Sequence, residues 1–270
     1  MIFVRDKGRL CNNILQYGHL YAWGREHGRK TMSMRFAYKY RHFRICHTYP
    51  HNLLTYLFAK YGAKCGWLPV VSFDDDKGVS LENEQMLYRH RNIVAQGWYA
   101  RWYDLFLKYK GEIIDLFAFD EDVKKSPDKL LETFSPTDVL LGIHIRRGDY
   151  KTWHDGRYYF SDGQYIEKIS QFLRWHKDRK VQVIICGNDP RLDEEAYRKA
   201  LPYCSLHFPK GTPFEDLYMF SQCNFLMGPP STFTLVASMY RDLPLCWIEP
   251  GEQLTNNSFK YFDELFQKIK

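Results

Sequence analysis

The second half of the chain alternates short apolar runs with amphipathic segments. The run VLLGIHIRRGDY, residues 139–150, changes from apolar residues to a histidine, two arginines, a glycine and an aspartate. An apolar run in front of a glycine is typical of a buried strand. Further strands are predicted over 180–186, 205–208, 224–227 and 245–248, and helices over 165–175, 193–201, 213–221, 234–240 and 259–269. This strict alternation predicts a parallel sheet with helices on both faces.

The first half alternates less regularly. Residues 1–4 predict a strand, and the helical spacing that follows predicts a helix with Asn12 or Asn13 as its N-cap. Residues 67–73 predict a second strand, and the aromatic-rich segment 92–119 is predicted to be mainly helical. Because residues 120–138 are charged and contain two prolines, we place a domain boundary there. We expect an N-terminal domain over 1–136 and a C-terminal domain over 137–270, with the last helix packing back on the first domain.

Polar side chains follow three of the predicted strands in the second half. Ligands of open α/β sheets bind outside the carboxyl ends of the strands, so we expect these side chains to converge on one crevice. Strand alternation sends His144 and Arg146 to one face and Arg147 to the other, where it would anchor the loop. The three clusters are His144, Arg146 and Asp149; Asn188 and Asp189; and Ser231 and Thr232.

The chemistry of these clusters suits a nucleoside diphosphate. Arg146 offers a planar fork of donors that fits a diphosphate. The carboxylate of Asp189 can accept two hydrogen bonds from a guanine. Ser231 and Thr232, at a helix N-terminus, can bind the remaining phosphate oxygens. The competing interpretation of the two arginines is a surface loop held by salt bridges.

Charge and cysteine usage narrow the class of protein. The formal net charge of +6 favours an anionic partner. Seven cysteines are scattered singly, which predicts reduced thiols and neither a disulfide framework nor a zinc site. No run of residues is typical of a signal peptide or a spanning helix. We therefore expect a cytoplasmic protein with at most a peripheral contact at the inner face of a membrane.

Two other segments allow different functions. Asp74 and Asp76 follow a predicted strand, where they could hold Mg²⁺ or Mn²⁺, but acidic turns have the same composition. The basic and aromatic segment 30–51 would suit a nucleic acid or a polyanionic acceptor. We favour an amphipathic surface for this segment, and we expect no nucleic-acid partner.

Three stretches resemble one enzyme family. HIRRGDY resembles the first signature of the α1,2- and α1,6-fucosyltransferases and the protein O-fucosyltransferases, which use GDP-fucose. GRLCNNILQY is similar to the first loop and helix of that superfamily, and FEDLYMFSQCNFLMGPPSTFT resembles its late motif. The order of the motifs is also that of the family, and the bacterial α1,2-fucosyltransferase-like group is the most similar. The resemblance implies a GT-B fold, in which two Rossmann-like domains face a central cleft, and it implies no metal and no other cofactor.

The resemblance also implies residue roles. His144 would contact the nucleotide, and Arg146 would stabilise charge on the departing β-phosphate. The other donor-binding positions would be Asn188, Asp189, Ser231, Thr232 and Phe233, together with Leu10, Cys11 and Asn12 of the N-terminal loop.

The expected reaction is an inverting sugar transfer from a GDP-sugar, GDP-fucose being the expected donor. A hydroxyl of an oligosaccharide or lipid-linked glycan would attack the anomeric carbon opposite GDP. Asp149 and Asp6 are the candidate general bases, although Asp149 is also placed to orient Arg146. The alternatives are another nucleotide-sugar, a metal held by Asp74 and Asp76, or a non-catalytic protein that binds a glycan or a nucleic acid.

Overall fold

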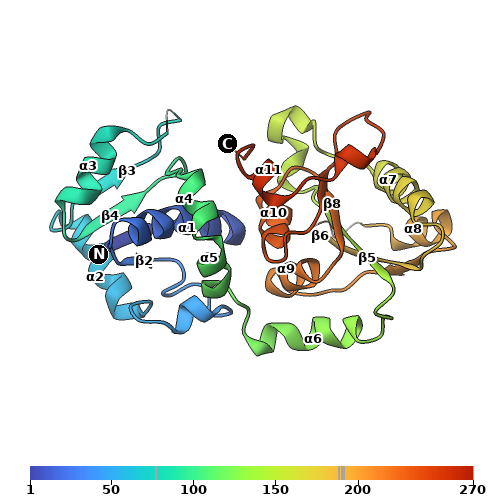
Figure 1. The fold of residues 1–270 in the computed structure, drawn as a ribbon, viewed down its shortest axis with the longest axis horizontal. Helices are drawn as coiled ribbons and strands as arrows, with labels where there is room; N and C mark the ends of the chain where they lie inside the picture. Colours follow the sequence, from blue (N-terminus) through green and yellow to red (C-terminus); the bar gives the residue numbers. More distant parts are fainter. Residues whose placement is uncertain (77, 188, 190–191, 270) are drawn as a thin grey trace. The chain divides into compact units, whose positions relative to one another are not determined.

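The computed structural model describes residues 1–76, 78–187, 189 and 192–269. This part of the chain forms two compact units, residues 1–122 and 123–269. They are coloured blue to green and green to red in Figure 1. The division falls at the start of α6 (Glu121–Leu131), whereas the sequence analysis places the boundary after residue 136.

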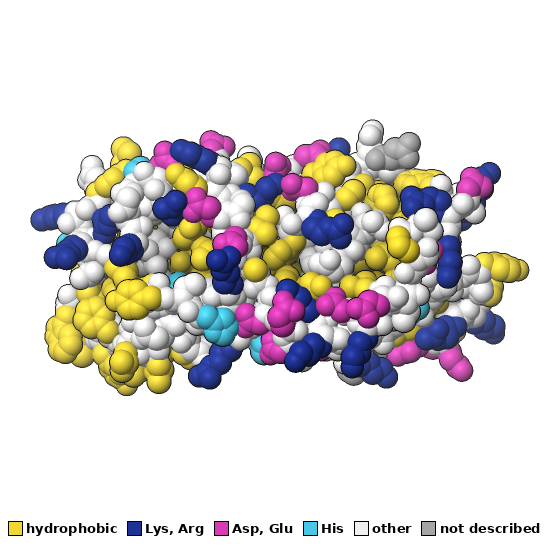
Figure 2. Space-filling model, turned by 60° about the horizontal axis from the view of Figure 1, so that its bottom comes forward, with side chains coloured by type: hydrophobic (Ala, Val, Ile, Leu, Met, Phe, Trp, Pro, Cys, Tyr) yellow, Lys and Arg dark blue, Asp and Glu magenta, His cyan; other side chains and the backbone are white. Residues whose placement is uncertain are grey.

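The first unit is a parallel sheet with helices. Across the sheet, the strands are β2 (Thr31–Ser33), β1 (Ile2–Arg5), β4 (Ile93–Gln96) and β3 (Val70–Ser72). The helices are α1 (Leu10–Glu26), α2 (Leu53–Lys64), α3 (Leu81–Arg89), α4 (Tyr103–Lys108) and α5 (Lys110–Leu116). Not all of its hydrophobic side chains are covered: a group of them reaches the surface at the lower left of Figure 2.

Two predictions for this unit are wrong. Residues 93–96 form β4, although the segment 92–119 was predicted to be mainly helical. Ile93, Val94 and Ala95 are fully buried because β4 lies between β1 and β3, a central position that suits a short apolar run. Helix α1 begins at Leu10 with Arg9 as its N-cap and no side-chain cap, so neither Asn12 nor Asn13 caps it.

The second unit confirms the predicted alternation. Its strands, in order across an entirely parallel sheet, are β7 (Ser205–His207), β6 (Val181–Gly187), β5 (Val139–Ile145), β8 (Phe225–Gly228) and β9 (Leu245–Trp247). Besides α6, its α-helices are α7 (Asp162–Trp175), α8 (Glu194–Ala200), α9 (Pro213–Ser221), α10 (Thr232–Met239) and α11 (Phe262–Phe266). Helix α11 packs against α10 of the same unit.

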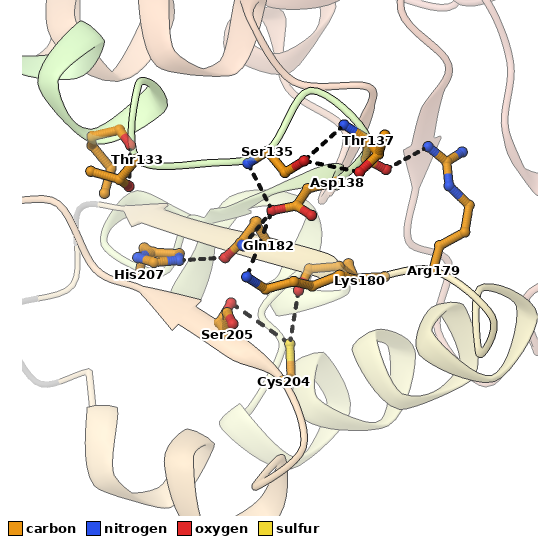
Figure 3. Close-up of polar contacts among 12 residues, drawn as sticks. Thr133, Ser135, Thr137, Asp138, Arg179, Lys180, Gln182, Cys204, Ser205 and His207 are labelled. Carbon is orange, nitrogen blue, oxygen red and sulfur yellow. Dashed lines mark hydrogen bonds and ion pairs between the residues drawn. The ribbon is translucent and has the colours of Figure 1, made fainter.

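A polar network joins β5, β6 and β7 (Figure 3); it runs from Asp138, directly before β5, through Gln182, near the start of β6, to His207, the last residue of β7. The carboxylate of Asp138 accepts hydrogen bonds from the backbone N–H of Ser135 at 3.2 Å and from the amide of Gln182 at 2.7 Å. The amide oxygen of Gln182 lies 2.9 Å from Nε2 of His207 on β7. Ligands of such sheets bind at the carboxyl ends of the strands, whereas this network starts at the amino ends of β5 and β6, so its role is structural.

Over the described ranges, no helix of either unit is long and apolar enough to cross a membrane.

Candidate functional site

The carboxyl ends of β5, β6 and β8 lie side by side in the second unit. His144 of β5 is in register with Cys186 of β6, and Ile143 is in register with Met227 of β8. Both neighbouring strands end in glycine, and a Cβ there would meet the backbone of β5. At Gly228 it would lie 2.8 Å from the carbonyl oxygen of His144, and at Gly187 it would overlap that of Ile145. These close approaches bring together the strand ends that the sequence analysis singled out.

His144 is held as a neutral, buried imidazole. It is 8% exposed, and its ring stacks on Phe233 of α10 with the centroids 4.9 Å apart. Burial, followed by the charge of Arg146, lowers the pKa of His144 to about 3. Its Nδ1 atom is buried and has no hydrogen-bond partner among the described residues. His144 is therefore available as a neutral hydrogen-bonding group and not as a cation.

Arg146 is held by two neighbours of the same loop. Its Nε and Nη2 atoms donate to the two carboxylate oxygens of Asp149, at 3.2 and 2.8 Å, and its guanidinium lies 4.7 Å from the ring centroid of Tyr150. The Tyr150 hydroxyl donates to the carbonyl oxygen of Pro230, just before α10. A guanidinium has five N–H donors, of which the pair with Asp149 uses two. The arrangement orients a cation at the end of β5.

Arg147 points into the second unit, as the alternation along β5 predicts. Its side chain is 7% exposed and donates to the carbonyl oxygen of Phe160 at 2.9 Å. It also forms ion pairs with Asp162 at 2.5 Å and Asp189 at 3.2 Å. Burial alone would lower the pKa of Arg147, but hydrogen bonds from it to Asp162 and Asp189 raise the pKa overall. Arg147 thus ties the β5 loop to the start of α7 and to the segment after β6.

The predicted guanine-binding residue lies in this network. The side chain of Asp189 is 5% exposed, and its Oδ2 atom faces Arg147. The contact with Arg147 fixes the carboxylate at the end of β6. The neighbouring candidate, Asn188, lies outside the described residues.

The third cluster forms the start of α10. Ser231 is the N-cap, and its hydroxyl accepts a hydrogen bond from the backbone N–H of Phe233 at 3.1 Å. Because Ser231 is 3% exposed, its hydroxyl serves mainly to cap the helix. The helix begins at Thr232 and not at residue 234 as predicted. The N-terminus of α10, with its positive dipole end, therefore lies next to His144 and to the loop of Arg146.

The N-terminal candidates belong to the first unit. Leu10 and Cys11 are buried in the first turn of α1, and Asn12 is half-buried. The turn before them is closed by Gln16, whose amide donates to the carbonyl oxygen of Lys7 at 2.6 Å and accepts from the Lys7 N–H at 3.1 Å.

The acidic candidates of the first unit are engaged within that unit. Asp6 is 1% exposed and accepts a hydrogen bond from Ser33, and burial raises its pKa to about 8. A buried, protonated carboxyl group is poorly suited to act as a general base. Asp74 pairs with Lys7 at 3.0 Å and accepts from Ser72 at 2.6 Å. Within the part of the chain that the structure describes, no three His, Cys, Asp or Glu side chains gather as a metal site would require.

Sequence reasoning missed two groups near the strand ends. Tyr150 connects the Arg146 loop to the α10 loop, and its only signal was its place directly after RRGD. Asp216, in the first turn of α9, contacts Cys186 at the end of β6. Burial raises the pKa of Asp216 to about 6. An aspartate in the first turn of a helix signals only a favourable helix start, and the position of Asp216 beside β6 comes from the tertiary fold.

Known proteins resemble this chain in sequence and in fold. No family model matches the chain. The chain is 24% identical over 259 residues to mouse galactoside 2-alpha-L-fucosyltransferase Sec1, an alignment that covers 88% of this chain and 64% of the relative. It is 23% identical over 258 residues to rat galactoside alpha-(1,2)-fucosyltransferase 2, covering 88% and 66%. The chain thus spans slightly less than two thirds of these relatives.

Solved structures share the fold at low sequence identity. A mutant of Arabidopsis thaliana FUT1 in complex with GDP superposes with a TM-score of 0.68 at 14% identity, covering 96% of this chain and 73% of that one. POFUT1 in complex with GDP-fucose gives 0.61 at 10% identity, covering 90% and 93%. NodZ alpha-1,6-fucosyltransferase soaked with GDP-fucose gives 0.54 at 12% identity, covering 96% and 98%. These likenesses confirm the predicted α/β fold of the GT-B type. The chain is therefore α1,2-fucosyltransferase-like in sequence and has the fold of the solved fucosyltransferases.

Proposed function

We propose that this chain is an inverting, metal-independent glycosyltransferase that moves L-fucose from GDP-fucose to a hydroxyl of a glycan. The observation that carries the proposal is the placement of Arg146. It is oriented by Asp149 and Tyr150 at the carboxyl end of β5, and Tyr150 links its loop to the start of α10. A fixed cation and a helix N-terminus suit a diphosphate, and the fold is that of proteins solved with GDP or GDP-fucose.

In the proposed reaction, Arg146 binds the β-phosphate and stabilises the charge that develops as GDP departs. An oriented donor is most effective when it does not have to reorganise during the reaction. Asp149 is first a positioning residue in this scheme, because both of its carboxylate oxygens face the guanidinium. A general-base role for Asp149 would require it to reach the acceptor hydroxyl, and its half-exposed carboxylate is open to solvent.

The other proposed donor-binding residues of the second unit lie at the same carboxyl edge of the sheet as Arg146. His144, as a neutral imidazole, is proposed to hydrogen-bond the nucleotide, and Asp189 to read the amino and imino groups of guanine. Phe233 stacks on His144 and is proposed to complete the base-binding surface together with the N-terminus of α10. Leu10, Cys11 and Asn12 are also proposed as donor-binding residues, and Ser231 and Thr232 are proposed to line the phosphates. Metal independence is part of the proposal, since Arg146 supplies the positive charge.

The acceptor is proposed to be a galactoside. This choice rests on the names of the mouse and rat relatives, which are galactoside fucosyltransferases. An oligosaccharide and a lipid-linked glycan carry the same reactive hydroxyl, and both fit the proposed chemistry.

A transfer assay tests the proposal. The purified chain is incubated with GDP-fucose or GDP-mannose and a β-galactoside oligosaccharide, and products are detected by mass. We expect fucosyl transfer, and we expect Arg146→Ala to lower turnover by a factor on the order of 10² to 10³. Arg241→Ala, an exposed arginine on the same unit, should leave turnover unchanged.

Two results would contradict this assignment. Absence of both transfer and donor hydrolysis with GDP-fucose and with GDP-mannose, or full activity in Arg146→Ala, would refute the donor site. Preference for GDP-mannose would refute the assignment of fucose while leaving the GDP-sugar class intact.

A further inference from the structure

Helix α2 of the first unit exposes its large apolar side chains. Leu54 is 79% exposed and Leu53 is 56% exposed, and about half the surface of Phe58 and of Tyr61 is also accessible. The fully buried residues of this helix are Ala59 and Gly62. An amphipathic helix on a sheet normally buries its large apolar residues, so the usual pattern is reversed in α2.

The reversal follows from how α2 packs. Ala59 belongs to a core cluster with Phe3 and Met32, and Gly62 lies so close to Leu68 that a Cβ would approach its side chain to 2.8 Å. Small residues on this side let the helix approach the sheet. Leu54, Phe58 and Tyr61, spaced i, i+4 and i+7, share another side of the helix. Of these, the half-exposed Phe58 still reaches the core, with its ring centroid 5.8 Å from that of Phe3.

The exposed surface extends beyond both ends of the helix. Tyr49, before α2, is 84% exposed, and Trp67, after it, is 75% exposed. The hydrophobic side chains at the lower left of Figure 2 lie over this part of the unit, with lysine and arginine side chains at its margin. We name this surface the outer apolar face; it consists of Tyr49, Leu53, Leu54, Phe58, Tyr61 and Trp67.

The surrounding sequence carries charge of one sign. Residues 27–73 contain none of the 32 Asp and Glu residues of the chain and eight of its 38 Lys and Arg residues. Some of these cations form ion pairs with acidic residues outside the segment; Arg44, for example, pairs with Asp115. Lys60 and Lys64 on α2 form no ion pair among the described residues, and the ammonium of Lys60 lies 5.6 Å from the ring centroid of Tyr61. The outer apolar face therefore has a positive margin.

A hollow of about 450 Å³ opens at the N-terminal end of α2. It is lined by Leu53 of the outer apolar face and by Arg41, Tyr38 and Asn52, among others. It thus offers hydrogen-bond donors and a cation directly beside an apolar surface, which suits a phosphate headgroup.

We propose that the outer apolar face docks on a bilayer that contains anionic phospholipids. Leu54, Phe58 and Trp67 would enter the boundary between headgroups and acyl chains, while Lys60 and Lys64 would meet the phosphates. Leucine, phenylalanine and tryptophan on one face with lysine beside them form the composition of helices that lie in the membrane interface. Apolar area and charge supply the two attractions that stable peripheral binding requires. The docking surface does not depend on the proposed sugar transfer.

Vesicle flotation tests the docking surface without any measurement of enzyme activity. The full chain is mixed with vesicles of phosphatidylcholine alone or with equal parts of phosphatidylcholine and phosphatidylglycerol. We expect it to float with the mixed vesicles, and less well at high salt, because charge attraction to the surface is screened.

Variants with matched controls locate the surface. The pair Leu54→Ser and Trp67→Ser should weaken binding by tenfold or more, from the apolar area lost to water. Leu81→Ser, on α3 and equally exposed at 80%, should not weaken it. Lys60→Gln with Lys64→Gln should weaken binding to the mixed vesicles by roughly thirty-fold, from the attraction of each lysine to an anionic surface. Lys177→Gln in the second unit is the charge control.

Several outcomes would overturn the proposal. The first is absence of binding to the mixed vesicles by a folded chain, with folding checked by circular dichroism. The second is equal loss of binding in Leu54→Ser and Leu81→Ser. The third is a dimer in solution that Leu54→Ser converts to a monomer while vesicles are not bound, because the face would then be a protein interface. Failure of sugar transfer with intact vesicle binding would refute the proposed function alone.

Discussion

Arg147→Ala is predicted to destabilise the second unit without removing a direct ligand of the nucleotide. The side chain of Arg147 is 7% exposed and joins three segments through Phe160, Asp162 and Asp189. Alanine removes all of these contacts at once. It also leaves the carboxylate of Asp189, 5% exposed, without the cation that faces it.

The magnitude follows from the burial of this pair. Removing one partner of a buried ion pair typically costs about 3 to 5 kcal/mol, since the remaining charge has lost its compensation. For a unit of this size, that corresponds to a drop of roughly 10 °C in the midpoint of thermal unfolding. Arg147→Lys should give a smaller loss, because an ammonium retains the charge but cannot reproduce the planar fork.

Arg146→Ala is the matched control. Arg146 pairs with Asp149, whose side chain is 45% exposed, and exposed pairs contribute only about 0 to 1 kcal/mol to stability. Thermal unfolding followed by circular dichroism, together with calorimetric titration of GDP, should separate the two arginines. Arg147→Ala should lower the unfolding midpoint more than the affinity of the folded protein for GDP, and Arg146→Ala should do the reverse. An unchanged midpoint in Arg147→Ala, or an equal fall in Arg146→Ala, would show that the assignment of the two roles is wrong.

Three further predictions test the geometry. Gly187→Ala should lower the free energy of unfolding by about 1 to 3 kcal/mol in urea titrations, since its Cβ would overlap the carbonyl oxygen of Ile145. Gly111→Ala is the control and should not lower the free energy of unfolding, because nothing lies within 4 Å of the added Cβ. Because burial raises the pKa of Asp6 from 3.8 to about 8, the folded state binds this proton more tightly, and stability should fall as pH rises between those values. Asp6→Asn should remove this dependence, which amounts to roughly 6 kcal/mol over the whole range. An unchanged pH profile would count against a protonated Asp6. EDTA should leave sugar transfer intact, whereas a loss of transfer that Mg²⁺ restores would argue for a metal-dependent reaction.

The sequence predicted the second unit well because its signals are local. Each strand there is an apolar run flanked by polar or turn residues, and both faces of the sheet are covered. Helix α9 occupies 213–221 as predicted, since Thr212 caps it and Pro213 begins it. In the first unit, β4 has only four residues and precedes an aromatic-rich segment, so its central position depends on pairing with β1 and β3. Such pairing leaves little signal in a short run of the chain.

The candidate site, like the fold, was predictable only where the signal lies within one stretch of the sequence. Alternation along β5 separated Arg146 from Arg147, and the structure places the latter among Asp162, Asp189 and Phe160. The contact of Tyr150 with Pro230, by contrast, joins segments far apart in the sequence. No local pattern reports such a contact, because it exists only once β5 and β8 are paired.

Helix α2 shows the limit of periodicity as a guide to burial. A repeat of large apolar residues identifies one side of a helix, but packing decides whether that side faces the core. In α2, Ala59 and Gly62 allow close approach to the sheet, so Leu54 and Phe58 are left on the outside. Burying such side chains fully would contribute about 1.5 to 3 kcal/mol each. Since the fold forgoes this stabilisation, an apolar environment outside the fold, as a bilayer provides, accounts for the reversed pattern.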